Sequence, residues 1–304
     1  MRKQLCEALL LRSSSPKMIF LTGDLGFMAL EELRDSMGER FINAGVAEQN
    51  MISVAAGMAM QNLEVWVYSI APFCYARPFE QIRNDICFHD LPVKIIGNGG
   101  GYGYGVMGPT HHAIEDYGIL LALPNMSAYV PIFDEDLYSV IPKLGAETHP
   151  AYLRLGRSEA PNDFSVPPYS AWRQLTCGQG KTVIAVGPIG GTYIAAFNQF
   201  PESVRPNLWA IAELPLSKNP LPKLLQDQID GDSGLMVIEE HVSRGGFASE
   251  LALNFLTQSH IPKRFSHFYA QAHTYSRYGS QVYLRKKSGL GVDVICAAAM
   301  SPDY

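Results

Sequence analysis

Apolar residues in the first half of the chain follow two alternating patterns. Short runs rich in β-branched and aromatic residues, typical of buried strands, occupy residues 18–23, 65–70, 93–98, 127–132 and 151–155. Between these runs, apolar residues recur at helical spacing over residues 27–37, 47–61, 73–88, 112–121 and 135–144. Strands that alternate with helices in this way form parallel sheets covered by helices on both faces. We therefore predict an α/β fold.

A break in this pattern divides the chain. Residues 157–174 are rich in proline and show neither period, which is typical of a linker. The alternation then resumes, with strand-like runs at 182–186, 208–214 and 235–240 and helical patterns at 189–199, 219–228, 246–258 and 280–287. We predict two parallel-sheet α/β domains, one over residues 1–157 and a smaller one over 177–304, joined by a linker over 158–176.

Composition narrows the class of protein. The chain has 304 residues, 47% of them apolar, and a net charge of −5, which argues against disorder and against binding to a nucleic-acid backbone. No apolar run approaches the ~20 residues of a membrane span, and the start MRKQLCEALLLRSSSP reads as a helix rather than a signal peptide. The five scattered cysteines fit reduced thiols in the cytoplasm. Only 17% of the residues are charged, below the typical ~25%, as expected when surface is buried against another subunit.

The segment GVAEQNM at residues 45–51 puts an acid at the start of a predicted helix. Glu48 would lie in the first turn, at the carboxyl end of the sheet, where α/β proteins bind ligands. An acid at this position also stabilises the helix through its dipole, by roughly 0.3–1 kcal/mol. From its position alone, Glu48 is therefore either a site residue or a structural one.

A glycine-rich run, NGGGYGYGVMGPTHH, covers residues 98–112 between a predicted strand and a predicted helix. Glycines allow the backbone to approach a ligand closely, but the run lacks the Lys-Ser/Thr ending of a P-loop. A long mobile loop is the alternative. His111 and His112 end the run. Adjacent side chains do not share a face and no carboxylate is suitably spaced, so we expect one histidine to be a polar site group and no metal site here.

The segment SIAPFCYARPFEQIRND at residues 69–85 is a third candidate. Its aromatic residues, among them Phe73 and Tyr75, have a spacing that ordinarily indicates core packing. Arg77 and the charged residues after it give the predicted helix an ordinary polar face. Taken by itself, this segment is not diagnostic.

Taken in order, these segments resemble the second half of a transketolase, which comprises a pyrimidine-binding domain and a carboxy-terminal domain. The matching strings span most of residues 18–250 in the family order and spacing, and they are LTGDL, RFINAGVAEQNMISVAAGMA, FEQIRNDI, GPTHHAIEDYGILLALPNM, PAYLRLGR and VIEEHVSRGG. AGVAEQNM followed by GPTHHAIED is the most specific pair. The resemblance implies a thiamine diphosphate-binding fold for the first domain and a transketolase carboxy-terminal domain for the second.

The resemblance also indicates a missing half. Transketolases bind thiamine diphosphate and Mg²⁺ through a GDG segment and a later asparagine in an amino-terminal domain. GDL at 23–25 and GDS at 231–233 are the nearest strings, and neither has that form. We therefore expect a split transketolase, in which an amino-terminal subunit carries the GDG motif and the Mg²⁺ ligands and pairs with this chain as an α2β2 heterotetramer. An obligate interface of more than ~2,000 Å² would account for the low charge content.

Cofactor roles carry over where residues match the family. Glu48 matches the acid that hydrogen-bonds the aminopyrimidine ring of the cofactor and activates it by sharing a proton. Phe73 matches the aromatic residue that stacks on that ring, with Tyr75 close by in the same wall. Asp24 and Leu25 match a cofactor-facing pair after the first strand.

Substrate roles carry over at His111, which matches the histidine that contacts the substrate near C2, and at Arg157, which matches an arginine used for the acceptor's phosphate. Two positions depart from the family. Met107 stands where an acid reads a sugar hydroxyl, and a second donor-site histidine is replaced around Gly99. Losing a hydroxyl-reading group changes selectivity by orders of magnitude. We therefore expect a modified, deoxy or nucleotide-linked sugar rather than the ordinary pentose phosphates.

The function implied is that of a transferase moving a two-carbon ketol unit from a ketose to an aldehyde acceptor in specialised sugar biosynthesis, active only with its partner. Three alternatives stay open: a β subunit of a 2-oxoacid dehydrogenase, half of a deoxyxylulose-phosphate synthase, and a non-catalytic transketolase-like interaction protein. GVAEQNM and THHAIED favour transketolase over the first, and the second is ordinarily a single chain. Glu48, Phe73 and His111 argue against the third, whereas Met107 and Gly99 keep it open.

Overall fold

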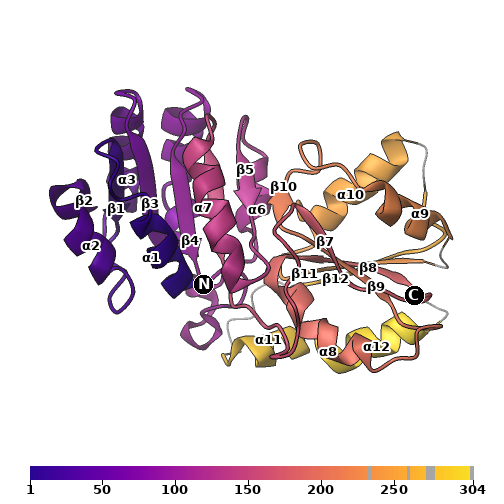
Figure 1. Cartoon of the computed structure of the whole chain (residues 1–304). Helices are drawn as coiled ribbons and strands as arrows, with labels where there is room; N and C mark the ends of the chain where they lie inside the picture. The colour runs from indigo at the N-terminus through magenta and orange to yellow at the C-terminus, as the bar shows by residue number, and fades with distance from the viewer. Residues whose placement is uncertain (232–233, 259–260, 272–277, 302–304) are drawn as a thin grey trace.

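A computed structural model of the chain describes residues 1–231, 234–258, 261–271 and 278–301. The first half forms one sheet with helices on both faces, drawn in indigo to magenta in Figure 1. In chain order its elements are α1 (Arg2–Leu10), β1 (Met18–Thr22), α2 (Glu31–Met37), η1 (Gly38–Arg40), β2 (Phe41–Asn43), α3 (Glu48–Ala59), β3 (Glu64–Ile70), α4 (Ala71–Tyr75), α5 (Phe79–Gln81), η2, a π-helix (Ile82–Cys87), β4 (Lys94–Asn98), η3 (Gly105–Met107), η4 (Pro109–His111), α6 (Asp116–Leu121), β5 (Ser127–Tyr129), η5 (Asp134–Asp136), α7 (Leu137–Ala146) and β6 (Ala151–Leu155).

The second half forms a smaller sheet beside the first (Figure 1). The elements of the second half of the chain are β7 (Trp172–Thr176), β8 (Thr182–Val186), η6 (Gly187–Tyr193), α8 (Ile194–Asn198), β9 (Asn207–Ile211), β10 (Glu213–Leu214), α9 (Lys223–Gly231), β11 (Leu235–Glu239), α10 (Phe247–Thr257), β12 (Phe265–Tyr269), α11 (Gln281–Lys287) and α12 (Val292–Met300).

Strand order in the first sheet is β10-β5-β6-β4-β3-β1-β2, and every pairing is parallel except that of β10 with β5. Alternate side chains of each strand enter different cores. Phe20 and Trp66 pack with α1, α2 and α7 on one face, whereas Leu21 and Val67 pack with α3, α4 and η2 on the other. A parallel sheet buried on both faces accounts for the nearly continuous apolar runs of its strands.

The second sheet has the order β12-β11-β8-β9-β7, and β7 runs antiparallel to β9. One face packs on α9 and α10 in a core that is continuous with the first sheet's, and the other packs on η6, α8 and α12. The predicted fold class, two α/β sheets that are mainly parallel, is confirmed. No helix in the described part of the chain is long and apolar enough to cross a bilayer.

The structure differs from the predicted elements in four places. The end of the predicted linker forms β7, and the predicted strand at 208–214 is divided between β9 in one sheet and β10 in the other. The predicted helix over 73–88 is broken into α4, α5 and a π-helix, because Pro78 lacks the amide donor that a continuous helix needs. Strand β12 and helix α12 were not predicted. Our division at 157 and 177 remains a proposal.

Candidate functional site

The predicted site residues gather at the carboxyl edge of the first sheet. Asp24 follows β1, Phe73 lies in the helix directly after β3, Gly99 follows β4 and Arg157 follows β6. This is the edge at which parallel α/β sheets bind ligands, because helix N-termini and loop backbones converge there.

Glu48 opens helix α3 and its side chain is buried, with a relative exposure of 1%. Its two carboxylate oxygens have different neighbours. Oε1 accepts a 3.4 Å hydrogen bond from Ser69 Oγ, at the end of β3. Oε2 accepts a 2.5 Å charged hydrogen bond from Arg77 Nη1. Gly23 faces the Oε1 side closely, since a Cβ there would lie 3.5 Å from Oε1.

Phe73 and Arg77 form a stack beside Glu48. The guanidinium carbon of Arg77 lies 4.3 Å from the centroid of the Phe73 ring, within the range of a cation–π interaction. Phe73 is half-buried and Arg77 is exposed. One planar cation thus contacts both the buried acid and the aromatic ring.

His111 ends η4 and approaches the same ring from another direction. Its imidazole centroid lies 5.1 Å from that of Phe73, with the ring planes inclined at 69°, and its Nδ1 lies 2.9 Å from Thr110 Oγ1. The neighbouring His112 is buried and contacts Tyr102 edge-on. The first histidine of the pair therefore borders the Phe73 ring, and the second packs on Tyr102.

Tyr75 lies in the core rather than in an exposed wall. It belongs to the buried cluster of the first sheet, and its hydroxyl donates a 3.3 Å hydrogen bond to Glu115 Oε2. Burial and the nearby carboxylates of Asp116 and Glu115 raise the pKa of this phenol. The place of Tyr75 beside Phe73 in the cofactor wall, which the resemblance implied, stays a prediction.

Asp24 and Leu25 form a turn after β1. Asp24 has a positive φ of 58°, and its Oδ1 accepts a 2.8 Å hydrogen bond from Asn43 Nδ2. The carbonyl of Leu25 accepts a 2.8 Å bond from Thr22 Oγ1. Both residues line a cavity of about 160 Å³ at this edge of the sheet.

Gly99 and Met107 lie on the glycine-rich loop. Gly99 has φ = 81°, and a Cβ there would lie 2.2 Å from Cδ2 of Tyr104, whose hydroxyl accepts a 2.6 Å hydrogen bond from Asn98. The Tyr104 ring therefore fills the space that a larger residue at position 99 would need. Met107 ends η3 with 51% of its surface exposed.

Arg157 lines a cavity of about 650 Å³ together with residues from four other parts of the chain, among them Arg2, Asn98, Asp134 and Gln281. Two guanidinium groups thus border one space. Arg2 also donates a 3.0 Å hydrogen bond to the carbonyl of Phe27. Two cations are suited to bind an anionic group such as a phosphate.

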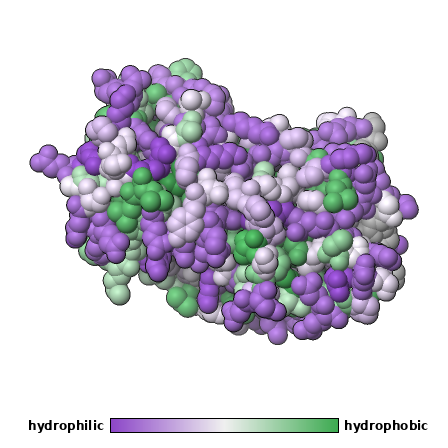
Figure 2. Space-filling view, in the orientation of Figure 1, coloured by the Kyte–Doolittle hydropathy of each residue, from purple (hydrophilic) through white to green (hydrophobic). Residues whose placement is uncertain are grey.

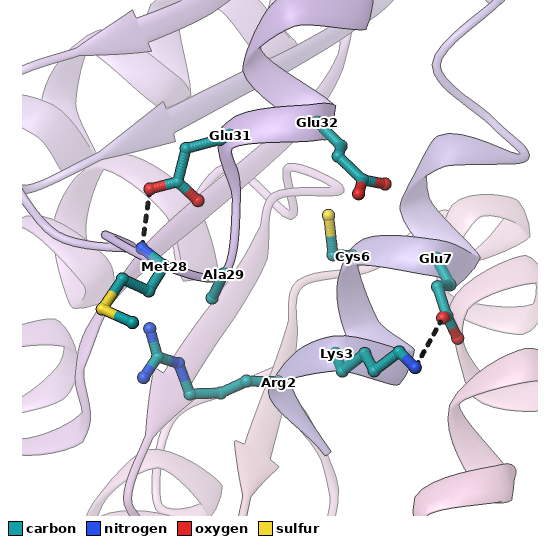
Figure 3. Close-up of a pocket in the computed structure, with 8 residues that line it drawn as sticks. All are labelled: Arg2, Lys3, Cys6, Glu7, Met28, Ala29, Glu31 and Glu32. Atoms are coloured by element: carbon teal, nitrogen blue, oxygen red, sulfur yellow. Dashed lines mark hydrogen bonds and ion pairs between the residues drawn. The ribbon is translucent and has the colours of Figure 1, made fainter.

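The cavity shown in Figure 3 lies between α1 and the start of α2, and Arg2 lines both it and the cavity of Arg157. Its charged side chains are largely engaged locally, since Glu31 accepts a 2.6 Å hydrogen bond from the amide of Met28 and Lys3 pairs with Glu7 (Figure 3). Burial raises the pKa of the Cys6 thiol that faces it, which is unfavourable for a nucleophile. We therefore assign no site to this cavity.

The second half of the chain holds the glycine-rich loop in place. Glu240 Oε1 accepts a 2.7 Å hydrogen bond from the amide of Tyr102, and a Cβ on Gly101 would lie 2.6 Å from the Glu240 carboxyl carbon. Arg285 binds Glu240 Oε2 through two nitrogens, at 2.8 and 2.7 Å. Burial acts to lower the pKa of Arg285, but the carboxylates of Glu240 and Glu159 outweigh it and raise that pKa.

Within the described residues, no group of three or more His, Cys, Asp or Glu side chains is arranged to hold a metal ion. Two residues of the GDS string, at 232 and 233, lie outside the described residues.

Sequence reasoning missed the position of Arg77, because it read residues 73–88 as one helix and Arg77 as part of its polar face. Pro78 was the available signal, since a proline interrupts a helix and turns the residue before it. It also missed the positions of Arg2 and Gln281, which no local pattern connects with the sheet edge.

Comparison with known proteins identifies the family of the first half. Residues 7–162 match the family model described as the transketolase pyrimidine binding domain. This segment contains every site residue predicted from the sequence.

Relatives extend the similarity over most of the chain. A subunit of the apulose-4-phosphate transketolase of Phocaeicola vulgatus is 26% identical over 272 residues, covering 86% of this chain and 85% of that one. The protein of the same name in Actinobacillus succinogenes is 25% identical over 268 residues, with the same coverage. A solved structure titled as a split gene transketolase, inactive beta4 tetramer, superposes with a TM-score of 0.81 at 27% identity, covering 98% of this chain and 96% of that one.

Proposed function

This chain belongs to the transketolase family, in which it matches the carboxy-terminal subunit of a split enzyme, and we propose that it binds the aminopyrimidine end of thiamine diphosphate at Glu48 and Phe73. The reaction is the transfer of a two-carbon ketol unit from a ketose to an aldehyde acceptor. The partner is an amino-terminal subunit that holds the diphosphate and Mg²⁺, and the assembly is an α2β2 heterotetramer.

The observation that carries this proposal is the pairing of a buried carboxylate with an aromatic ring at the carboxyl edge of the sheet. An aminopyrimidine is planar and presents nitrogen atoms at its edge. The guanidinium of Arg77, also planar and nitrogen-edged, fits between Glu48 Oε2 and the Phe73 ring. The accepting carboxylate, the stacking ring and the space between them therefore suit an aminopyrimidine.

When bound, thiamine diphosphate supplies the electron sink needed to cleave a carbon–carbon bond next to a carbonyl group. Glu48 would hold a proton at the aminopyrimidine ring nitrogen, and its burial would exclude competing water. Phe73 would orient the ring by stacking. His111, which contacts Phe73, would donate a hydrogen bond to a substrate oxygen near the reacting carbon. Asp24 and Leu25 line the neighbouring cavity and would face the cofactor, whereas the buried Tyr75 would support Phe73 from behind.

For the substrate we propose a phosphorylated sugar other than the ordinary pentose phosphates. The cavity that Arg157 and Arg2 border supports a phosphate at the outer end of the substrate. Met107 offers no charged hydrogen-bond acceptor, and Tyr104 fills the space beside Gly99, so two hydroxyl-reading groups of the family are absent. The two relatives named for apulose-4-phosphate support a role in specialised sugar metabolism.

Dependence on a partner is supported by apolar residues around the proposed site. Four exposed side chains border the sheet edge or the glycine-rich loop: Phe27, Met28, Val46 and Val106. On the face that Figure 2 shows, scattered apolar residues lie within a mostly polar surface. A partner subunit seated over this edge would cover them and would supply the metal ligands.

Calorimetry tests the proposal directly. Thiamine diphosphate with Mg²⁺ is titrated into this chain alone, into its GDG-bearing partner alone, and into the mixture. We expect binding in the mixture and none to this chain by itself. Tight binding to the isolated chain would contradict the division of the site between two subunits, and no binding to the mixture would favour the non-catalytic alternative.

A further inference from the structure

Arg77 makes, within one chain, both of the contacts that the proposed function assigns to the cofactor ring. Its Nη1 lies 2.5 Å from Glu48 Oε2, and its guanidinium carbon lies 4.3 Å from the centroid of Phe73. These contacts with Glu48 and Phe73 are enough to explain the position of the Arg77 side chain. A guanidinium and an aminopyrimidine share the features that these two partners recognise, which are a flat π-surface and nitrogen-bound hydrogens in its plane.

We propose that Arg77 stands in for the aminopyrimidine ring in the subunit without cofactor, and that the cofactor binds only after this guanidinium has left. The proposal rests on the proposed function. It makes the Arg77 side chain an occupant of the cofactor site that competes with the ligand, rather than a ligand-binding group.

The two oxygens of Glu48 are not equivalent, and this makes the competition direct. Oε1 faces Ser69 at 3.4 Å and is also closely faced by Gly23. Oε2 is the oxygen that accepts the hydrogen bond of Arg77, whose guanidinium lies over the Phe73 ring. A ring that hydrogen-bonds Oε2 and stacks on the same face of Phe73 needs the volume that the guanidinium fills.

The charge of Glu48 explains why the free subunit needs such a substitute. A buried carboxylate without a partner is costly, because its lost hydration is not replaced. Arg77 supplies a counter-charge and a hydrogen bond while the ring is absent. Once a ring bonds to Glu48, that need disappears.

Arg77 is also placed to leave without disturbing the fold. Its side chain is 40% exposed, whereas that of Glu48 is 1% exposed. It lies in the short connection between α4 and α5, so rotation of its own side chain moves the guanidinium into solvent. Neither the strand end that carries Ser69 nor the helix that carries Glu48 has to move.

Competition of this kind lowers the apparent affinity for the ligand. If the ion-paired state holds about 90% of the molecules, the apparent dissociation constant is about tenfold higher than that of the open state. Removing the guanidinium should therefore tighten binding by about tenfold, although the variant has lost a cation near an anionic cofactor.

The experiment measures dissociation constants by calorimetry in the assembled complex of both subunits with Mg²⁺. Wild type, Arg77→Ala and Arg77→Lys are titrated with thiamine diphosphate and with 4-amino-5-hydroxymethyl-2-methylpyrimidine, an uncharged fragment that removes any effect of the diphosphate. Arg77→Lys keeps the positive charge but cannot stack as a plane, and it serves if Arg77→Ala fails to fold. Arg83→Ala is the matched control, because Arg83 is an exposed arginine of the π-helix η2 whose side chain, in the described structure, hydrogen-bonds locally to Asn84.

We expect both ligands to bind more tightly to each folded Arg77 variant and unchanged to Arg83→Ala. Unchanged or weaker binding by every folded Arg77 variant would overturn the proposal, as would equal tightening in Arg83→Ala. These results leave the proposed function intact, since the wild type still binds. Failure of wild type to bind thiamine diphosphate at all would instead overturn the proposed function, and this inference with it.

Discussion

Glu48 is the buried side chain on which the chemistry of the proposed site most depends. It is held at the first turn of α3, where the helix dipole favours a negative charge, and Arg77 favours it further. Ser69 donates a hydrogen bond to the same carboxylate. These neighbours fix the position of a carboxylate that can accept hydrogen bonds at the place where the proposed function puts the cofactor ring.

Glu48→Gln should abolish turnover while leaving the complex of the two subunits intact. Glutamine has nearly the same shape but cannot share a proton as a carboxyl group does, and general acid–base groups contribute about 10²–10⁴-fold to a rate. Steady-state kinetics gives the turnover, and analytical ultracentrifugation gives the assembly. Activity close to that of the wild type would show that Glu48 has no catalytic role.

Met107→Asp should improve the use of ordinary pentose phosphates, by about tenfold in kcat/KM, if position 107 reads a sugar hydroxyl. A hydrogen bond to a charged acceptor is worth about 1.5–3 kcal/mol, which is enough for such a change. Val106→Asp is the control, because Val106 is the exposed neighbour in the same turn. Equal effects of the two variants would mean that charge alone, rather than position 107, alters the preference.

At the scale of elements, the glycine-rich loop is shaped by close packing as much as by flexibility. Gly99, Gly101 and Gly108 all have positive φ values. At each of them a Cβ would collide with a side chain, which is Tyr104, Glu240 and Tyr278 respectively. The loop therefore adopts one packed course beside the proposed site.

Gly99→Ala should destabilise the protein more than Gly289→Ala. Both glycines have similar positive φ values, 81° and 77°, but an added Cβ at Gly289 meets nothing within 4 Å. The strain of a left-handed backbone costs about 1–2 kcal/mol in either variant, and overpacking against Tyr104 adds about 1–3 kcal/mol for Gly99→Ala. Urea denaturation measures both free energies of unfolding, and equal losses would show that Tyr104 yields without cost.

At the scale of the whole molecule, residues of the second half of the chain hold the glycine-rich loop beside the proposed site. Glu240, at the end of β11, hydrogen-bonds the amide of Tyr102 on the glycine-rich loop. Arg154 of β6 donates a 2.8 Å hydrogen bond to the carbonyl of Glu240 and pairs with Asp116 at 3.0 Å. These buried contacts fix the orientation of the two sheets, because charged groups out of water need all of their partners.

Arg285→Met should lower the free energy of unfolding by about 3–5 kcal/mol, because Glu240 would remain buried without its counter-charge. Lys286→Met is the matched control: the neighbouring lysine makes an exposed ion pair with Asp293 at 3.8 Å, and such pairs contribute little. Thermal unfolding of both variants measures the difference. A small effect of Arg285→Met would mean that water reaches Glu240 and replaces the pair.

Much of the fold could be predicted because its strands are buried on both faces. Residues 65–70 and 151–155 read as apolar runs and form central strands. The predicted helix over 73–88 was wrong as a continuous element, and strand β7 was missed inside a proline-rich stretch, since only its pairing with β9 makes it a strand. The local propensity for helix or strand is a weak predictor where tertiary contacts determine the secondary structure.

The sequence by itself determined the family, the α/β class and the candidate residues Glu48, Phe73, His111 and Arg157, because periodicity and ordered motifs are properties of the linear chain. Only the tertiary structure decided which of these side chains meet. It brought Glu48, Phe73 and Arg77 into one cluster, left Tyr75 in the core, and joined Glu240 to a loop far away in sequence. Distances between side chains depend on packing of the whole chain, and no local pattern encodes them.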